Sequence, residues 1–127
     1  GVIAKDIYGN IASGSSTGGL TDRHSGRLGD THINGISTIA DNRYGAIVVS
    51  GKGENIIKHH VASNVFYNLK YSNISLKAAI NNTLKECPKC GIIGIDKKGN
   101  MYYNYNTDRM YIGMCSDKSN IVVNIWN

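Results

Sequence analysis

Residues 46–70 read AIVVSGKGENIIKHHVASNVFYNLK, and the hydrophobic pattern changes twice within them. The apolar, β-branched run at residues 46–49 predicts a buried strand, and the glycine-rich stretch after it predicts a tight turn. Beyond the turn, apolar side chains recur every four residues at Ile57, Val61, Val65 and Leu69. This spacing is typical of an amphipathic helix, which we expect over residues 54–70.

A second helix is expected shortly after the first. Ser75 can cap its N-terminus, and Pro88 lies just beyond its expected end. The side chains expected on its buried face are Leu76, Ala79, Ile80 and Leu84.

Two expected hairpins lie on either side of these helices. The first joins residues 2–7 to residues 11–16, and the second joins residues 92–96 to residues 101–103. Both turns carry the pattern Asp-x-x-Gly-Asn, in which glycine is available for a position with positive φ. A last strand is expected at residues 121–126. The order of strands, helices and strands predicts an α+β fold in which helices cover an antiparallel sheet.

Composition limits the class of protein. With 127 residues, of which 41% are hydrophobic and 18% charged, we expect one globular unit spanning residues 1–127. The net charge of +5 is modest and the lysines are scattered, so we expect no nucleic-acid partner. We also expect no targeting segment within residues 1–127, which leaves a leader upstream open, and no contact with a membrane. The compartment stays open between cytoplasmic and lysosomal or secretory.

Three cysteines raise the question of a metal or redox site. Cys87 and Cys90 have CxxC spacing, but only Cys115 could add a third ligand, and a zinc site normally takes four. The pair also follows a helical pattern, whereas a thioredoxin-like site lies between a strand and a helix. We therefore favour a turn in which the cysteines are incidental or form a local disulfide, and we expect no metal site.

The segment from Ser13 to Gly53 is rich in glycine, which by itself is typical of a loop-rich sheet edge. It holds three motifs: Ser15-Ser16-Thr17-Gly18-Gly19, Gly26-Arg27-Leu28-Gly29-Asp30-Thr31 and Ser50-Gly51-Lys52-Gly53-Glu54. In order and spacing, these motifs resemble the signature of the asparaginase-like threonine hydrolases, a family of N-terminal-nucleophile (Ntn) hydrolases. The family contains plant-type asparaginase with isoaspartyl peptidase activity, glycosylasparaginase and threonine aspartase. Residues 105–111 resemble a further segment of the family.

The resemblance implies how the protein is made and assembled. In the family, a precursor cleaves itself and exposes an N-terminal Thr within Thr-[Val/Ile]-Gly, and this Thr begins the β subunit. Gly1 matches the glycine of that motif, so the nucleophilic Thr is expected two residues before Gly1. The implied fold is the β-subunit half of a four-layer αββα sandwich. An α subunit from the same precursor completes it, in an (αβ)₂ heterotetramer, and no cofactor is implied.

Three candidate residues would bind the amino-acid head group of a substrate. Arg27 offers a planar fork for an α-carboxylate, and Asp30 offers a carboxylate for the α-ammonium. Gly53 would let the backbone approach the substrate, with its carbonyl accepting from the ammonium. The alternative for Arg27 and Asp30 is a mutual salt bridge, and the alternative for Gly53 is a tight turn.

Three further candidates would serve the chemistry. Thr17 would orient the nucleophile or its amine, and its alternative is a Thr at a strand end that satisfies backbone groups. The hydroxyl of Ser50 and the backbone N–H of Gly51 match the pair that stabilises the oxyanion, and the alternative for Gly51 is again a tight turn. We expect no special role for the four histidines.

The expected function is hydrolysis of a side-chain amide in a small molecule or short peptide. The candidate substrates are L-asparagine, β-aspartyl peptides and N-glycosylated asparagine, and Gly18-Gly19 favours the first two. Two alternatives stay open. One is an endopeptidase of the threonine aspartase type, which shares Ser50 but whose substrate would leave Asp30 without an ammonium to bind. The other is a catalytically inactive homologue or fragment that acts as a binding module.

Overall fold

The strands and helices follow the chain in the expected order. The computed structural model describes residues 1–117 and 119–125. Its elements are β1 (Val2–Lys5), β2 (Ile11–Gly14), β3 (Thr38–Asp41), β4 (Gly45–Gly51), α1 (Gly53–His59), α2 (Val61–Tyr71), α3 (Leu76–Glu86), β5 (Cys90–Asp96), β6 (Met101–Tyr105), β7 (Ile112–Ser116) and β8 (Ser119–Asn124). These strands pair antiparallel, in agreement with the predicted α+β class. None of the helices described is long and apolar enough to cross a membrane.

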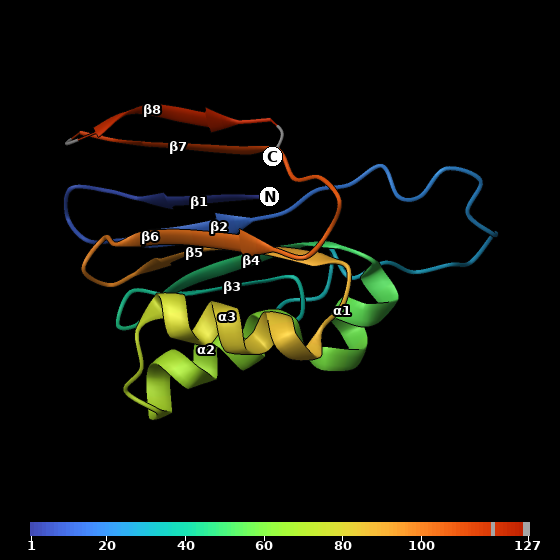
Figure 1. Cartoon of the computed structure of the whole chain (residues 1–127), viewed down its shortest axis with the longest axis horizontal. Coiled ribbons are helices and arrows are strands. Elements are labelled where there is room, and N and C mark those ends of the chain that lie inside the picture. Colours follow the sequence, from blue (N-terminus) through green and yellow to red (C-terminus); the bar gives the residue numbers. More distant parts are fainter. Residues whose placement is uncertain (118, 126–127) are drawn as a thin grey trace.

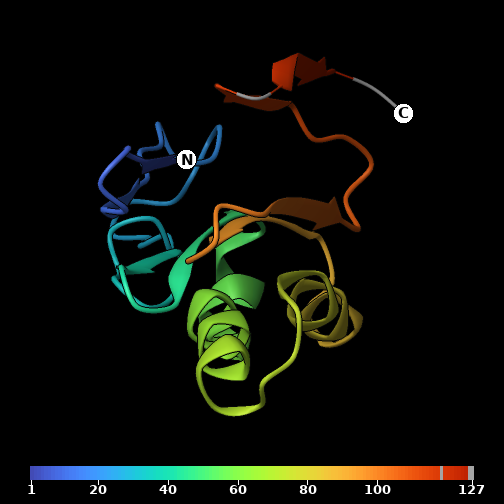
Figure 2. The ribbon, with the colours of Figure 1, turned by 90° about the vertical axis from the view of Figure 1, so that its left-hand side faces the viewer.

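A four-stranded antiparallel sheet, in the order β3-β4-β5-β6, forms the centre of the structure. Its inner strand β4 pairs with β5 over its full length, from Gly45 opposite Asp96 to Gly51 opposite Cys90. The helices cover one face of this sheet (Figure 1). The hairpins β1-β2 and β7-β8 lie on the opposite side, as the perpendicular view in Figure 2 shows. The described chain therefore has a helix layer, a sheet, and a second strand layer made of two separate hairpins.

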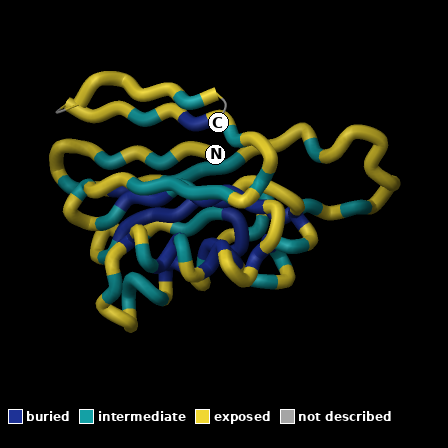
Figure 3. Tube along the Cα trace, in the orientation of Figure 1, coloured by how far each residue is buried: buried dark blue, intermediate teal, exposed yellow. Residues whose placement is uncertain are grey.

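Alternation along β4 divides the buried side chains between two cores. Ile47 and Val49 point toward the helices and belong to the larger core. Ala46 points the other way and packs with Ile11 and Ile95 in a much smaller core under the first hairpin. Figure 3 shows the same asymmetry, because buried residues concentrate where the sheet meets the helices. Hydrophobic stabilisation therefore comes mainly from the helix side.

Both predicted hairpins are confirmed, and their turns have the same hydrogen bonds. In each turn, the aspartate carboxylate accepts the backbone N–H groups two and four residues ahead and the asparagine side-chain amide, at 2.7 to 2.9 Å. The glycine of each turn has a φ of 91°. The hydrogen bond from the Asn10 side chain is the main cause that lowers the pKa of Asp6 below its ordinary value. The shared pattern Asp-x-x-Gly-Asn thus specifies one turn geometry twice.

The prediction of a single helix over residues 54–70 is wrong, because the chain breaks at His60 into α1 and α2. His60 has a φ of 48° and a ψ of 46°, in the left-handed region. The cause lies outside the helix. The backbone N–H groups of Ala62 and Ser63 donate to carbonyls in the loop before β3, at 3.1 and 2.8 Å, so α2 begins on that loop. The apolar period continues across the break and still buries Val61 and Val65.

The second predicted helix is confirmed as α3, and its expected apolar face is buried. Ser75 Oγ accepts the backbone N–H of Ala78 at 3.2 Å, as expected of an N-cap. Strands β3 and β7 are additions to the expected elements. The last predicted strand, residues 121–126, corresponds to β8, and its final predicted residue, Trp126, lies outside the described residues.

Candidate active site

All six candidate residues line one cavity of about 110 Å³. They come from the loop after β2, the end of β4 and the beginning of α1. The residues are Thr17, Arg27, Asp30, Ser50, Gly51 and Gly53, and Gly1 lines the same cavity. The fold therefore brings the three sequence motifs and the start of β1 to one place.

The turn between β4 and α1 fixes the backbone at Ser50 and Gly51. Gly51 has a φ of 149° and lies against the carbonyl of Lys89, where a Cβ atom would overlap the oxygen. The backbone N–H of Lys52 donates to the same carbonyl at 2.9 Å. A side chain at position 51 would disrupt this turn, so the structure requires glycine there independently of any chemical role.

Gly1 lies against the face of β4 that carries Ser50. A Cβ atom on Gly1 would overlap Val48 Cγ1. Because alternate residues of a strand share a face, Val48 and Ser50 both point toward β1 and away from the helices. The start of β1 and the Ser50 side chain are therefore neighbours across the two strand layers.

The candidate head-group residues meet at Gly53. A Cβ atom on Gly53 would lie 2.9 Å from Asp30 Oδ1 and 3.1 Å from Arg27 Nη2. Asp30 is only 7% exposed. A positive and a negative side chain therefore flank one bare backbone position, an arrangement that suits a ligand with both an ammonium and a carboxylate.

Arg27 forms its ion pair with Glu54. Arg27 Nε donates to Glu54 Oε1 at 2.9 Å, and this hydrogen bond lowers the pKa of Glu54 below its ordinary value. The alternative of a mutual salt bridge with Asp30 is therefore not the pairing that the described residues form. Sequence reasoning gave Glu54 no role although it ends the third motif, because its partner lies 27 positions away.

Thr17 lies in the loop after β2 and is exposed. Its Oγ1 accepts the backbone N–H of Gly19 at 3.0 Å. Nearby, Ser15 Oγ donates to the carbonyl of Thr31 at 2.9 Å and ties the loop together. A hydroxyl that accepts one hydrogen bond can still donate its own proton, so this contact is compatible with both interpretations of Thr17.

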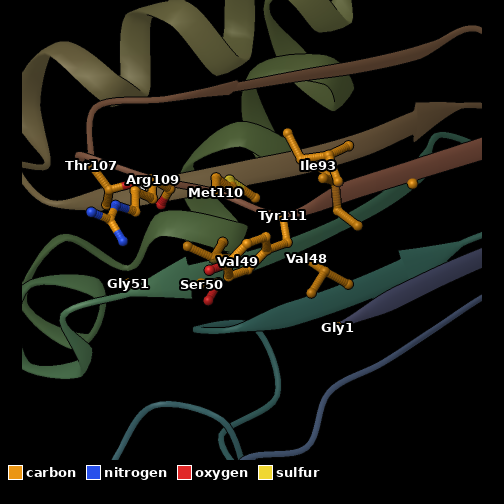
Figure 4. A pocket seen from close by; sticks show the side chains of 12 residues that line it. Gly1, Val48, Val49, Ser50, Gly51, Ile93, Thr107, Arg109, Met110 and Tyr111 are labelled. Carbon is orange, nitrogen blue, oxygen red and sulfur yellow. Dashed lines mark hydrogen bonds between the residues drawn. The ribbon is translucent and has the colours of Figure 1, made fainter. Parts of the chain in front are cut away.

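A second cavity, of about 280 Å³, adjoins the first and shares Ser50 and Gly51 with it. Its far side is formed by Thr107, Arg109, Met110 and Tyr111 in the connection from β6 to β7, as Figure 4 shows, and by the first two residues of β7. Thr107 Oγ1 donates to the carbonyl of Arg109 at 2.8 Å within this connection. The sequence indicates this segment only through the resemblance of residues 105–111, and its position beside Ser50 depends on the fold.

Cys87 and Cys90 are buried free thiols in the turn that joins α3 to β5. Asn106 holds this turn. Its side-chain amide donates to the carbonyls of Leu84 and Cys87 at 2.9 and 2.8 Å, and its Oδ1 accepts the backbone N–H of Cys90 at 2.9 Å. Burial raises the pKa of both thiols. The turn interpretation is supported, and among residues 1–117 and 119–125 no three His, Cys, Asp or Glu side chains are grouped to hold a metal ion.

Known proteins are similar to this chain over most of its length. A family model described as asparaginase matches residues 1–125. The isoaspartyl peptidase of Escherichia coli is 34% identical over 116 residues, which cover 87% of this chain and 36% of that protein. The proteins named isoaspartyl peptidase/L-asparaginase in Bos taurus and Xenopus laevis are 33% and 32% identical, and each match covers 87% of this chain and 37% of the relative. The chain spans less than two fifths of the length of each of these relatives. Because the family model matches nearly the whole chain, the chain belongs to the asparaginase-like Ntn-hydrolase family.

Proposed function

We propose that this chain is the β-subunit part of an amidohydrolase that cleaves the side-chain amide of asparagine-type substrates with an N-terminal Thr nucleophile. The observation that carries the proposal is the single cavity in which the six candidate residues lie together beside Gly1. The relatives named isoaspartyl peptidase and L-asparaginase support the same class of reaction.

The pairing of β1 with β2 supports the proposed position of the nucleophile, two residues before Gly1. Val2 lies opposite Gly14. If the antiparallel register continues, moving about three positions along each strand from this pair places the nucleophile opposite Thr17. Strand alternation would turn its side chain the same way as position 1, toward the face of β4 that carries Ser50. A Thr there would have its hydroxyl and α-amine between Thr17 and Ser50.

In the proposed reaction, the Thr hydroxyl attacks the carbon of the substrate's side-chain amide. The α-amine of the same Thr acts as general base, directly or through the hydroxyl, and Thr17 orients these groups. The Ser50 hydroxyl and the Gly51 backbone N–H stabilise the oxyanion that forms. Expulsion of the amine leaves an ester between the substrate acyl group and Thr, and water then hydrolyses this ester.

The head group of the substrate is proposed to lie between Arg27 and Asp30. Arg27 binds the α-carboxylate, while Asp30 and the carbonyl of Gly53 bind the α-ammonium. The buried position of Asp30 strengthens such a contact, because a charge that is shielded from water interacts more strongly with its partner. An internal aspartate of a protein has no free ammonium, so this arrangement favours small substrates over an endopeptidase reaction.

The second cavity bears on the choice of substrate. It begins at Ser50 and Gly51, where the reacting carbonyl would lie, and its volume of about 280 Å³ exceeds the needs of ammonia. A leaving amino acid would use this space, so we place β-aspartyl peptides first among the substrates, followed by L-asparagine.

The rest of the assembly is proposed to be an α subunit from the same precursor, in an (αβ)₂ heterotetramer. The second strand layer consists of two separate hairpins, and β8 exposes Ile121, Val122 and Val123. Strands of the α subunit would join the hairpins and cover these side chains, and its helices would form the fourth layer of the αββα sandwich.

The proposal is tested by expressing the full precursor and assaying three substrates in parallel. The measured products are leucine from β-aspartyl-leucine, ammonia from L-asparagine, and free aspartate from N-glycosylated asparagine. We expect hydrolysis of the first two. Cleavage of a protein substrate in place of all three would indicate an endopeptidase of the threonine aspartase type. Absence of any hydrolysis would indicate an inactive module.

A further inference from the structure

The guanidinium of Arg27 is bound by a carboxylate on one side and lies beside bare backbone on another. Glu54, in the first turn of α1, accepts its Nε–H at 2.9 Å. A Cβ atom on Gly29 would lie 3.3 Å from Nη1, and one on Gly53 would lie 3.1 Å from Nη2. Both glycines line the candidate cavity. The two terminal nitrogens therefore lie beside bare backbone, while the Nε edge is engaged by a carboxylate.

This geometry decides which edge of Arg27 can face a ligand. A guanidinium binds a carboxylate in bidentate fashion through one of its edges, and each such edge uses two N–H groups. The edge that includes Nε competes with Glu54, which already accepts the Nε–H. The edge formed by Nη1 and Nη2 has no such competitor among the contacts described. It lies next to Gly29 and Gly53, which have no side chain.

We propose that Glu54 is a positioning residue that fixes the rotation of Arg27, so that the Nη1 and Nη2 edge meets the substrate α-carboxylate. The inference rests on the proposed function and adds a specific role to a residue outside the head-group contacts. Glu54 acts through Arg27 and does not touch the substrate. Its side chain is 49% exposed and that of Arg27 is 18% exposed, so the pair stands at the rim of the cavity.

Two other effects of Glu54 must be separated from positioning. An acidic residue in the first turn of a helix stabilises the helix on its own. Glu54 also places a negative charge near the proposed carboxylate site, so removing it strengthens the general attraction for an anion. This second effect has the opposite sign to the loss of positioning. The variants Glu54→Gln and Glu54→Ala distinguish them, because Gln removes the charge but keeps an acceptor for Arg27 Nε.

The experiment uses the assembled enzyme and a pair of substrates. L-Asparagine carries the α-carboxylate, and L-asparagine amide has a neutral amide in its place. For Glu54→Ala we expect KM for L-asparagine to rise about three- to tenfold, the range expected when one side chain must be ordered on binding. We expect kcat to stay within about twofold and KM for the amide to stay unchanged, since that substrate has no carboxylate to misplace. Glu54→Gln should restore KM for L-asparagine to about the wild-type value.

A double variant and a matched control complete the test. In an Arg27→Ala background, Glu54→Ala should no longer raise KM for L-asparagine, because the side chain through which it positions the substrate is gone and only the charge effect, of opposite sign, remains. Asp41 forms a comparable ion pair with Arg43 in the turn from β3 to β4. Asp41→Ala should therefore leave both KM values at their wild-type level.

The outcomes separate this inference from the proposed function. If the wild-type enzyme hydrolyses L-asparagine but Glu54→Ala changes KM for L-asparagine and for its amide equally, the positioning role is overturned. The proposed function still stands in that case. The positioning role would also be overturned if Glu54→Ala raised KM for L-asparagine equally in the wild-type and Arg27→Ala backgrounds. A wild-type enzyme that hydrolyses no asparagine-type substrate would overturn both.

Discussion

At the scale of single residues, the candidate site combines charged and hydroxyl side chains with backbone positions that have no side chain. Gly51 lies against the Lys89 carbonyl, and Gly53 lies between Asp30 and Arg27. Because these positions are bare, the charged groups and the end of β4 can approach one another closely. The charges are thus held near Ser50, where the chemistry is proposed to occur.

Replacing Ser50 tests the proposed oxyanion pair. Ser50→Ala removes a donor, so we expect kcat to fall by about 100-fold or more, with a smaller change in KM. Ser50→Thr keeps the hydroxyl and should retain kcat within a few-fold. Steady-state kinetics of both variants with β-aspartyl-leucine provides the measurement. If Ala and Thr behave alike, the Ser50 hydroxyl does not stabilise the transition state.

Replacing Arg27 tests head-group binding. Arg27→Ala removes a charge-assisted bidentate partner, so KM for L-asparagine should rise by about 30-fold or more, equivalent to at least ~2 kcal/mol. Arg43, which pairs with Asp41 away from the cavity, provides the control, and Arg43→Ala should leave KM unchanged. An unchanged KM in Arg27→Ala would show that another group binds the carboxylate.

At the scale of elements, sequence patterns predicted the turns and caps that depend only on residues close together in the chain. The Asp-x-x-Gly-Asn turns and the Ser75 cap are local, and the structure contains them as expected. The break at His60 was missed because it depends on carbonyls of a distant loop, which accept from the start of α2. The ion pair of Glu54 with Arg27 was missed for the same reason. The six candidate residues could be named from their motifs, but their meeting in one cavity depends on the fold.

The left-handed backbone at His60 gives a test of the helix break. A β-branched side chain fits this conformation poorly, so His60→Ile should lower the free energy of unfolding by about 1 kcal/mol or more. Asparagine tolerates the left-handed region, and His60→Asn should leave stability nearly unchanged. Urea unfolding of the assembled protein measures both. Equal stability of all three proteins would contradict a left-handed residue at this position.

The ion pair in the turn between β3 and β4 predicts how the stability of the protein depends on pH. Hydrogen bonds from the Arg43 side chain and backbone lower the pKa of Asp41 to about 2. A carboxyl with a lowered folded-state pKa stabilises the protein fully above its ordinary pKa of about 4, and this contribution is lost as pH falls through the folded-state value. Asp41→Asn should therefore lower the melting temperature at neutral pH, and the difference from wild type should shrink from about pH 4 toward pH 2. A difference that stays constant over this range would exclude the ion pair as its cause.

At the scale of the whole molecule, the two faces of the central sheet differ. The face toward the helices is well buried, whereas the face toward the hairpins is largely open. The helices and the central sheet enclose the larger core, whereas the hairpin layer buries little. The candidate cavity lies at this open side, with Gly1 on its wall. Under the proposed function, an α subunit completes the strand layer and the Thr that precedes Gly1 completes the catalytic group. Both are parts that one self-cleaving precursor would supply.

The N-terminal sequence of the mature β chain, read from the protein purified after expression of its full precursor, tests the central claim most directly. We predict a chain that begins with Thr followed by Val or Ile and then by Gly1, together with a separate α chain of the same precursor. A mature chain with any residue other than Thr two positions before Gly1, or a precursor that remains uncleaved, would contradict an N-terminal Thr nucleophile.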